Sequence, residues 1–290
     1  MAHFDALFDI RGKTAIVTGA SSGLGMTFAG VLAERGANVV LAARRTERLK
    51  QVAEKISQAG GTAFPVTCDV SDPDQVKAMV DASVEHLGRI DILVNNAGVA
   101  SDGGMMPEKV PNEIFEEVVR VNLLGVWYCC REVGQRMLSD GKGGSVINIP
   151  SIAGLNGMQN FPVAYQATKA AVINLTRNLA CSWADRGIRV NAIAPGWFPS
   201  EMTGPYLGAP VFLEHAKKMA PMGRIGDPSE LAGVLLLLAS GASSYVTGHT
   251  IAVDGGVSAS MGLPFMNEEL FKLFSEVMPG GLGQRIMPSQ

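Results

Sequence analysis

Two kinds of hydrophobic pattern alternate along the chain. Short runs rich in Val, Ile, Leu and Ala predict strands at 14–18, 38–42, 62–67, 90–94, 145–149, 188–194 and 251–254. Longer stretches with helical spacing predict helices at 23–35, 46–58, 111–138 and 163–186, and two more that begin at Ser71 and Asp227, where a capping side chain precedes an early proline. Strands that are largely apolar and alternate with helices indicate a parallel sheet covered on both faces. We therefore predict an α/β, doubly wound, Rossmann-type fold.

Two segments lie outside this alternation. The stretch 196–224 contains four prolines and predicts a long irregular loop of the kind that forms lids or binding sites, or else a surface insertion. Residues 257–290 follow the last strand, and the apolar spacing predicts a short amphipathic helix at 267–278. Because no change of composition marks a linker, we expect one domain over 1–256 and a C-terminal extension over 257–290.

Composition limits the classes of function. Apolar residues make up 47% of the 290 positions, which excludes a disordered chain, and the net charge of −3 gives no basic footprint for nucleic acid. The longest apolar run, 231–239, is too short to cross a bilayer. The four cysteines have no metal-site spacing. We expect a cytoplasmic protein that binds no membrane, nucleic acid or metal.

A glycine-rich turn follows the first strand. It runs from Thr18 through Gly19, Gly23 and Gly25 into a helix. Glycines let backbone N–H groups approach a pyrophosphate closely, and the helix N-terminus adds a positive partial charge. Because the turn sits between a strand and a helix, it predicts a dinucleotide site rather than a merely tight turn.

Four further motifs appear in order along the chain. They are Asp69-Val70, Asn95-Asn96-Ala97-Gly98, a Tyr165-x-x-x-Lys169 pair, and Asn191 to Pro195-Gly196. Together with the spacing of the glycine turn, they resemble the short-chain dehydrogenase/reductase family. The resemblance implies a cofactor site made of Gly19, Ser21, Ser22, Gly23, Leu24, Gly25, Asp69, Val70, Asn96, Ala97, Gly98, Tyr165, Lys169, Pro195, Gly196, Phe198 and Ser200. Backbone near Phe198 and the Ser200 hydroxyl would hold the nicotinamide carboxamide.

The end of the second strand bears on which dinucleotide is bound. Ala43 stands where a carboxylate would favour NAD(H), and Arg44 and Arg45 follow. A guanidinium can bind a phosphate through two hydrogen bonds. We therefore expect NADP(H), with NAD(H) less favoured; the alternative is that both arginines are ordinary solvated charges.

Tyr165 and Lys169 are four residues apart on a predicted helix, so both side chains share one face. A nearby ammonium, together with the positive nicotinamide of an oxidised cofactor, should lower the pKa of the phenol, which would make Tyr165 a general acid for reduction and a general base for oxidation. The resemblance implies that Ser151 holds the substrate oxygen, although it precedes Tyr165 by fourteen residues where most relatives have thirteen. It also implies that Asn122 disrupts its helix and binds a water that relays protons from Lys169.

The substrate is less defined. The predicted pocket walls are largely apolar and aromatic, with Asp102 and Glu201 as the charged exceptions, which favours a neutral carbonyl or alcohol substrate. Three alternatives stay open: a reductase of 3-oxoacyl thioesters, a sugar-acid dehydrogenase, and a non-catalytic dinucleotide-binding regulator. A methyltransferase would require an acid where Ala43 stands. The family resemblance also implies a homotetramer or, failing that, a dimer.

Overall fold

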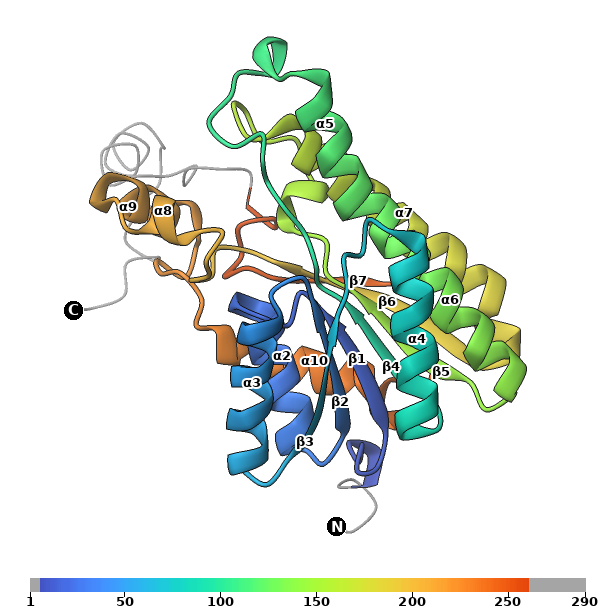
Figure 1. Ribbon diagram of the computed structural model, residues 1–290. Helices are drawn as coiled ribbons and strands as arrows, with labels where there is room; N and C mark the ends of the chain where they lie inside the picture. Colours follow the sequence, from blue (N-terminus) through green and yellow to red (C-terminus); the bar gives the residue numbers. More distant parts are fainter. Residues whose placement is uncertain (1–5, 261–290) are drawn as a thin grey trace, which may run out of the picture.

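The computed structural model describes residues 6–260, and within them seven parallel strands form one sheet in the order β3-β2-β1-β4-β5-β6-β7 (Figure 1). The strands are β1 (Thr14–Thr18), β2 (Asn38–Ala43), β3 (Thr62–Thr67), β4 (Ile92–Asn95), β5 (Gly144–Asn148), β6 (Ile188–Pro195) and β7 (Thr250–Val253). Each prediction of a strand is confirmed to within one or two residues. The chain leaves β1 in opposite directions toward β2 and β4, which is the doubly wound order.

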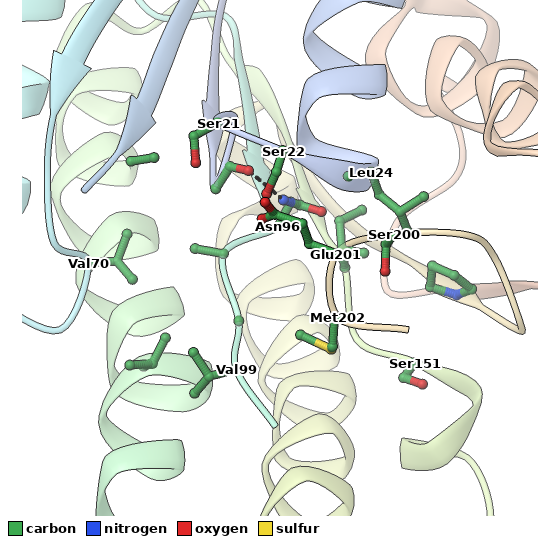
Figure 2. A pocket seen from close by; sticks show the side chains of 18 of the residues that line it. Ser21, Ser22, Leu24, Val70, Asn96, Val99, Ser151, Ser200, Glu201 and Met202 are labelled. Carbon is green, nitrogen blue, oxygen red and sulfur yellow. Dashed lines mark hydrogen bonds between the residues drawn. The ribbon is translucent and has the colours of Figure 1, made fainter. Parts of the chain in front are cut away.

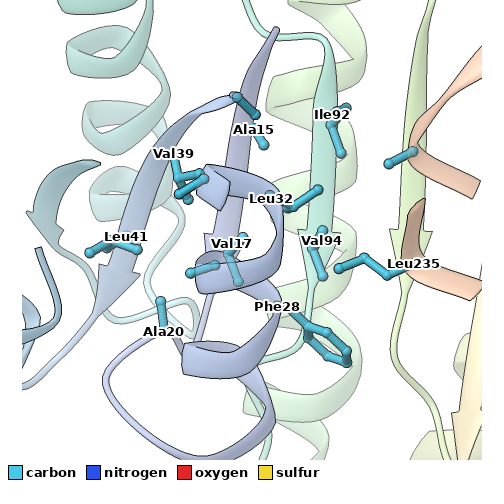
Figure 3. Packing of buried hydrophobic residues seen from close by; sticks show 14 of the residues in the cluster. Ala15, Val17, Ala20, Phe28, Leu32, Val39, Leu41, Ile92, Val94 and Leu235 are labelled. Carbon is cyan, nitrogen blue, oxygen red and sulfur yellow. The ribbon is translucent and has the colours of Figure 1, made fainter. Parts of the chain in front are cut away.

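The pleat of the strands divides the core between the two faces of the sheet. Ala15 and Val17 of β1 point to one face, and Ile16 between them points to the other. The first face is covered by α2 (Gly23–Glu34), α3 (Thr46–Gln58) and α10 (Ala232–Ala239), and Figure 3 shows Phe28 of α2 and Leu235 of α10 packed there. The second face is covered by α4 (Pro73–Leu87), α6 (Gly125–Asp140) and α7 (Val163–Trp183).

The long helix predicted at 111–138 has an irregular centre. It comprises α5 (Asn112–Val119), a π-helical turn η2 (Arg120–Leu124), and α6. Asn122 lies inside the π turn, so the expectation that it disrupts the helix is confirmed.

The expectation of an irregular stretch at 196–224 is wrong. The segment holds two helices, α8 (Gly204–Leu207) and α9 (Pro210–Met219), which lie beyond the carboxyl ends of the strands (Figure 1). Short single turns complete the chain: η1 (Pro107–Lys109), η3 (Ile152–Gly154), η4 (Ala184–Arg186), η5 (Pro228–Leu231) and η6 (Gly241–Ser243). The helix expected at 267–278 lies outside the described residues. No helix between residues 6 and 260 combines the length and the apolar character needed to cross a bilayer.

Candidate active site

The ends of β1 and β4 are tied together at the point where the strand order reverses. The Thr18 hydroxyl accepts hydrogen bonds from the backbone N–H groups of Asn96 (3.0 Å) and Ala97 (3.1 Å), and Asn96 Nδ2 donates to the Thr18 carbonyl (2.9 Å). Ligands of open α/β sheets bind in the crevice at such a reversal. The glycine turn is therefore held directly against the Asn-Asn-Ala-Gly motif.

Two glycines of the turn have no room for a side chain. A Cβ on Gly19, which has a φ of +68°, would lie 2.8 Å from Asn96 Nδ2, and one on Gly25 would lie 2.3 Å from the Gly19 carbonyl oxygen. The close approach of Gly25 brings the start of α2 against the end of β1. The absence of a side chain at Gly25 thus allows the helix to pack this closely against the turn.

A cavity of about 400 Å³ opens over this turn (Figure 2). Figure 2 shows Ser21, Ser22 and Asn96 at one end of the cavity and Ser151 at the other. Of the predicted cofactor-binding and catalytic residues, all line this cavity except Gly25 and Asn122. The cavity wall consists of Gly19, Ser21, Ser22, Gly23, Leu24, Arg44, Arg45, Asp69, Val70, Asn96, Ala97, Gly98, Ser151, Tyr165, Lys169, Pro195, Gly196, Phe198 and Ser200, together with several residues that were not predicted.

The basic end of the cavity is more elaborate than the sequence suggested. Arg45 donates to the hydroxyls of Ser21 (3.1 Å) and Ser22 (2.7 Å), and it forms an ion pair with Glu201 (2.7 Å). Arg48, from the first turn of α3, pairs with the same carboxylate. Arg44 is more exposed and lies 4.0 Å from Asp69. Sequence analysis missed Arg48, although its position three residues after Arg45 could have indicated it.

The other end of the cavity brings together Ser151, Tyr165 and Lys169. Lys169 Nζ lies 5.3 Å from the centroid of the Tyr165 ring and donates to the Ile149 carbonyl (2.9 Å). Ser151 precedes η3, and its hydroxyl accepts from the backbone N–H of Ala153 (3.1 Å). One polar group from the turn after β5 and two from α7 therefore face the same space.

Burial sets the acidity of this group. Burial raises the pKa of Tyr165, and hydrogen bonding from Ser151 partly offsets this rise. Burial also lowers the pKa of Lys169 to about 8. In the chain without cofactor, desolvation of the phenol outweighs the effect of its neighbours, so the expected lowering of the Tyr165 pKa is not seen there. The phenol holds its proton at neutral pH.

Asn122 lies behind the cavity wall and is fully buried. Its Oδ1 accepts from the Val99 N–H (2.8 Å), and its Nδ2 donates to the Val99 carbonyl (2.8 Å) and the Thr168 hydroxyl (3.3 Å). A Cβ on Gly98 would come within 3.3 Å of Asn122 Oδ1 and 3.4 Å of Lys169 Nζ. The π turn thus fixes the loop after β4 close to Lys169.

The segment after β6 folds into a turn beside the glycine-rich loop. Thr203 donates from its hydroxyl to the Phe198 carbonyl (2.6 Å) and from its N–H to the Ser200 hydroxyl (3.1 Å). A Cβ on Gly23 would lie 3.2 Å from Ser200 Cβ. Phe198 and Ser200 are therefore held at the cavity edge by Thr203, a residue that sequence analysis did not single out.

Asp102 was expected on the wall of the substrate pocket, but it is buried behind the cavity and does not line it. Its carboxylate is fully buried and accepts from the backbone N–H of Ala164 (2.7 Å) and, more distantly, of Tyr165 (3.5 Å). These are N–H groups of the first turn of α7, which have no partner within the helix. Asp102 thus ties the loop after β4 to the turn that carries Tyr165.

An unbroken series of ring contacts leads from Tyr165 to the helices beyond the sheet. Phe161 contacts Tyr165 and Trp197 edge to face, with centroids 6.2 and 6.1 Å away, and Trp197 contacts Phe212 of α9 in the same way at 5.1 Å. Tyr206 of α8 completes the series at 5.6 Å from Phe212. This series gives the region beside Tyr165 an aromatic wall.

The residues present fit a nicotinamide dinucleotide. The glycine turn leaves backbone exposed at a helix N-terminus for the pyrophosphate, and Gly98 leaves the space beside Lys169 open. The cavity runs from guanidinium groups at one end to a phenol, a hydroxyl and an ammonium at the other. Such a site can hold a long, charged cofactor and place its far end beside an acid–base group.

Comparison with known proteins agrees with this geometry. Residues 19–258 match a family model described as enoyl-(acyl carrier protein) reductase. A galactitol 2-dehydrogenase (L-tagatose-forming) from Cereibacter sphaeroides is 38% identical over 254 residues, which are 87% of this chain and 98% of that protein. A 3-oxoacyl-[acyl-carrier-protein] reductase from Staphylococcus aureus is 38% identical over 246 residues, 84% of this chain and 98% of that protein.

Solved structures share the fold. The crystal structure of a gluconate 5-dehydrogenase from Burkholderia cenocepacia, in complex with NADP and tartrate, has a TM-score of 0.83 and 35% identity. The similarity covers 88% of this chain and 99% of that one. Fold, cavity and relatives agree, and the chain belongs to the short-chain dehydrogenase/reductase family, as an oxidoreductase that interconverts a carbonyl and a secondary alcohol with a nicotinamide dinucleotide.

Proposed function

We propose that the protein is an NADP(H)-preferring reductase of neutral ketones, with Asn122, Ser151, Tyr165 and Lys169 as its catalytic group. The observation that carries the proposal is that Ser151, Tyr165 and Lys169 line the same cavity as the glycine turn and Arg45. A module that only binds a dinucleotide has no need of a protonated phenol and a hydroxyl at the far end of its site.

The roles of the side chains follow from their positions. A bound NADPH would supply hydride to the carbonyl carbon. The Ser151 hydroxyl donates a hydrogen bond to the carbonyl oxygen, and the Tyr165 hydroxyl gives that oxygen its proton. Lys169 contributes a positive charge beside the phenol and binds the nicotinamide ribose, while Asn122 keeps the neighbouring loop in place and binds the relay water.

The preference for NADP(H) rests on charge. Ala43 ends β2 without a carboxylate, and Arg44, Arg45 and Arg48 surround the place where the 2′ position of the adenosine ribose would lie. A dianionic phosphate suits such a set of guanidiniums. The gluconate 5-dehydrogenase relative was crystallised with NADP.

The proposal of a neutral ketone substrate rests on the aromatic wall and on two carboxylates that already have partners within the protein. Asp102 is turned to the N-terminus of α7 and Glu201 to the arginines, so neither carboxylate serves a substrate. Phe161, Trp197 and Phe212 favour a carbonyl compound with an apolar face. This argues for a neutral ketone over a sugar acid or a carrier-bound thioester.

We propose a homotetramer in the cytoplasm. Phe115 on α5 and Trp127 on α6 are exposed on adjoining helices, as an interface between copies would require. The free thiols of Cys68, Cys129 and Cys130 agree with a reducing compartment. Light scattering of the wild type and of Trp127→Glu tests the assembly; a monomeric wild type would contradict it.

Turnover tests the reaction. The purified protein is mixed with NADPH and a panel that contains aryl and alkyl ketones, a 3-oxoacyl thioester and a sugar keto-acid, and cofactor absorbance is followed. We expect the ketones to be reduced, and Tyr165→Phe to lower kcat by about 10²-fold or more. Tyr245→Phe, at a fully exposed ring, is the matched control. Equal turnover by wild type and Tyr165→Phe would refute the assigned acid, and a clear preference for the thioester or keto-acid would refute the substrate class.

A further inference from the structure

The Glu201 carboxylate occupies the centre of the basic end of the cavity. Arg45 reaches it with two nitrogens, Nη2 to Oε2 at 2.7 Å and Nη1 to Oε1 at 3.2 Å, and Arg48 pairs with Oε1. The two arginines lie at and just after the end of β2, whereas Glu201 follows β6, more than 150 positions away in the sequence. The Glu201 side chain therefore connects two opposite walls of the cavity. Figure 2 shows it near Ser22.

Glu201 is ionised throughout the physiological range. Hydrogen bonds from Arg45, and then from Arg48 and Ser22, lower its pKa to about 2. A single carboxylate is thus shared between two guanidinium groups. Both partners remain half open to water, so the pairs can break and re-form readily.

A carboxylate and a phosphate make the same kind of contact with a guanidinium. Each presents two oxygens to the planar fork of N–H donors. Under the function proposed above, Arg45 and Arg48 are the groups that would bind the 2′-phosphate. Glu201 and that phosphate would compete for the same N–H groups, and their negative charges would repel one another.

A free 2′-hydroxyl has the opposite relation to Glu201. A hydroxyl can donate a hydrogen bond to a carboxylate, which is how an acid at the end of the second strand favours NAD in related folds. That position is Ala43 here, but Glu201 brings a carboxylate to the same end of the cavity from the other side. The same end of the cavity therefore offers guanidinium groups to a 2′-phosphate and a carboxylate to a free 2′-hydroxyl.

We propose that Glu201 is a specificity-determining residue that weakens the discrimination between NADP(H) and NAD(H). The contacts that carry this are its ion pairs with Arg45 and Arg48, and the proposal rests on the assignment of those arginines to the 2′-phosphate. With Glu201 in place, NADP binding must displace an internal anion, whereas NAD binding leaves it paired. Glu201 thereby allows the enzyme to use both cofactors.

Calorimetric binding of NADP⁺ and NAD⁺, without substrate, tests this directly. The two ligands differ only in the 2′-phosphate, so the ratio of their Kd values isolates the contact. The variants are Glu201→Gln, which keeps shape and removes charge, and Arg45→Ala, which tests the phosphate site itself. Glu47→Gln is the matched control, because Glu47 is an exposed acid next to Arg48 in sequence that pairs with Lys50 instead.

We expect Glu201→Gln to tighten NADP⁺ by about three- to tenfold, with no tightening of NAD⁺, and Glu47→Gln to change neither. Arg45→Ala should weaken NADP⁺ and leave NAD⁺ within about twofold. If Arg45→Ala acts as expected while Glu201→Gln leaves the ratio within about twofold of wild type, the role of Glu201 is wrong and the NADP(H) preference stands. If Arg45→Ala leaves the ratio unchanged, the preference itself is wrong.

Discussion

Lys169 and Tyr165 lie on one face of α7, with the ammonium nitrogen 5.3 Å from the centroid of the phenol ring, and burial shifts their pKa values in opposite directions, so that the pKa of Lys169 falls below that of Tyr165. The phenol becomes a weaker acid, and the ammonium becomes a stronger one. In the protein alone, Lys169 therefore titrates first as pH rises. This order is suited to reduction, in which Tyr165 must hold a proton to give.

The pH dependence of ketone reduction should follow the titration of Lys169. Its pKa is lowered to about 8, so its charge is present below that pH and is lost above it, while the raised pKa of Tyr165 keeps the phenol protonated over the same range. We expect kcat/KM for ketone reduction to be level below pH 8 and to fall as pH rises further. Circular dichroism at each pH controls for unfolding. A profile that stays level to pH 9.5 would contradict this assignment.

Lys169→Met should abolish reduction and yet stabilise the fold. Lys169 is 5% exposed, and its lowered pKa means that the folded state binds this proton less tightly than the unfolded state does. The free energy of unfolding should therefore rise by about 1–2 kcal/mol at pH 7, after allowance for the lost hydrogen bond to Ile149.

Thermal unfolding at several pH values measures this effect. The advantage of Lys169→Met should be full below pH 8 and shrink between pH 8 and 10.5, where the wild-type lysine loses its charge in the folded state first. A variant that melts below the wild type at pH 7 would show that the ammonium stabilises the fold.

Asp102→Ala should destabilise the start of α7 and reduce turnover together. The change leaves the N–H groups of Ala164 and Tyr165 without the buried acceptor that they now share. We expect a loss of about 1–3 kcal/mol in thermal or urea unfolding, and a fall in kcat that exceeds any change in the Kd of the cofactor.

Asp102→Asn separates the two effects, since it keeps an acceptor oxygen and should recover part of both losses. Asp185→Ala, at an exposed acid, is the control. Turnover and stability that are both unchanged in Asp102→Ala would refute the positioning role.

Phe212→Ala tests the aromatic wall. Its ring contacts both Trp197 and Tyr206, and under the proposed function this aromatic wall faces the larger substituent of the ketone, so removal of the ring takes away apolar contact surface. We expect KM for an aryl ketone to rise by about tenfold, with a smaller change for acetone, because only the larger substrate loses contact area. Val211→Ala, at the exposed neighbouring position, should change neither value. Equal changes for the two ketones would place Phe212 outside the substrate pocket.

The sheet and most of the cavity could be predicted from the sequence because their determinants are local. A run such as Thr14-Ala-Ile-Val-Thr18 is largely apolar because it is buried on both faces, and glycines mark the turn that follows it. The π turn at Asn122 was expected only through family resemblance. A single mid-helix asparagine does not distinguish a π turn from a regular one.

Other features were missed for identifiable reasons. Prolines suggested that 196–224 is irregular, yet Pro205 and Pro210 stand in the first turns of α8 and α9, where a missing N–H costs nothing. The pairing of Glu201 with Arg48 joins positions 153 residues apart, which no local pattern encodes. The raised pKa of Tyr165 in the chain without cofactor could not be predicted, because charge proximity is visible in a sequence and desolvation is not.

The double contact between Asn122 and Val99 limits which residues can replace this asparagine. One short side chain must offer a donor and an acceptor at once, since it satisfies both the N–H and the carbonyl of the same residue. An aspartate would place a carboxylate oxygen next to the Val99 carbonyl oxygen, where no donor is left between them. A leucine would leave both backbone groups of Val99 unpaired in the interior. Selection for architecture alone would therefore keep an amide at this position, so its invariance among homologues would not by itself demonstrate a part in proton transfer.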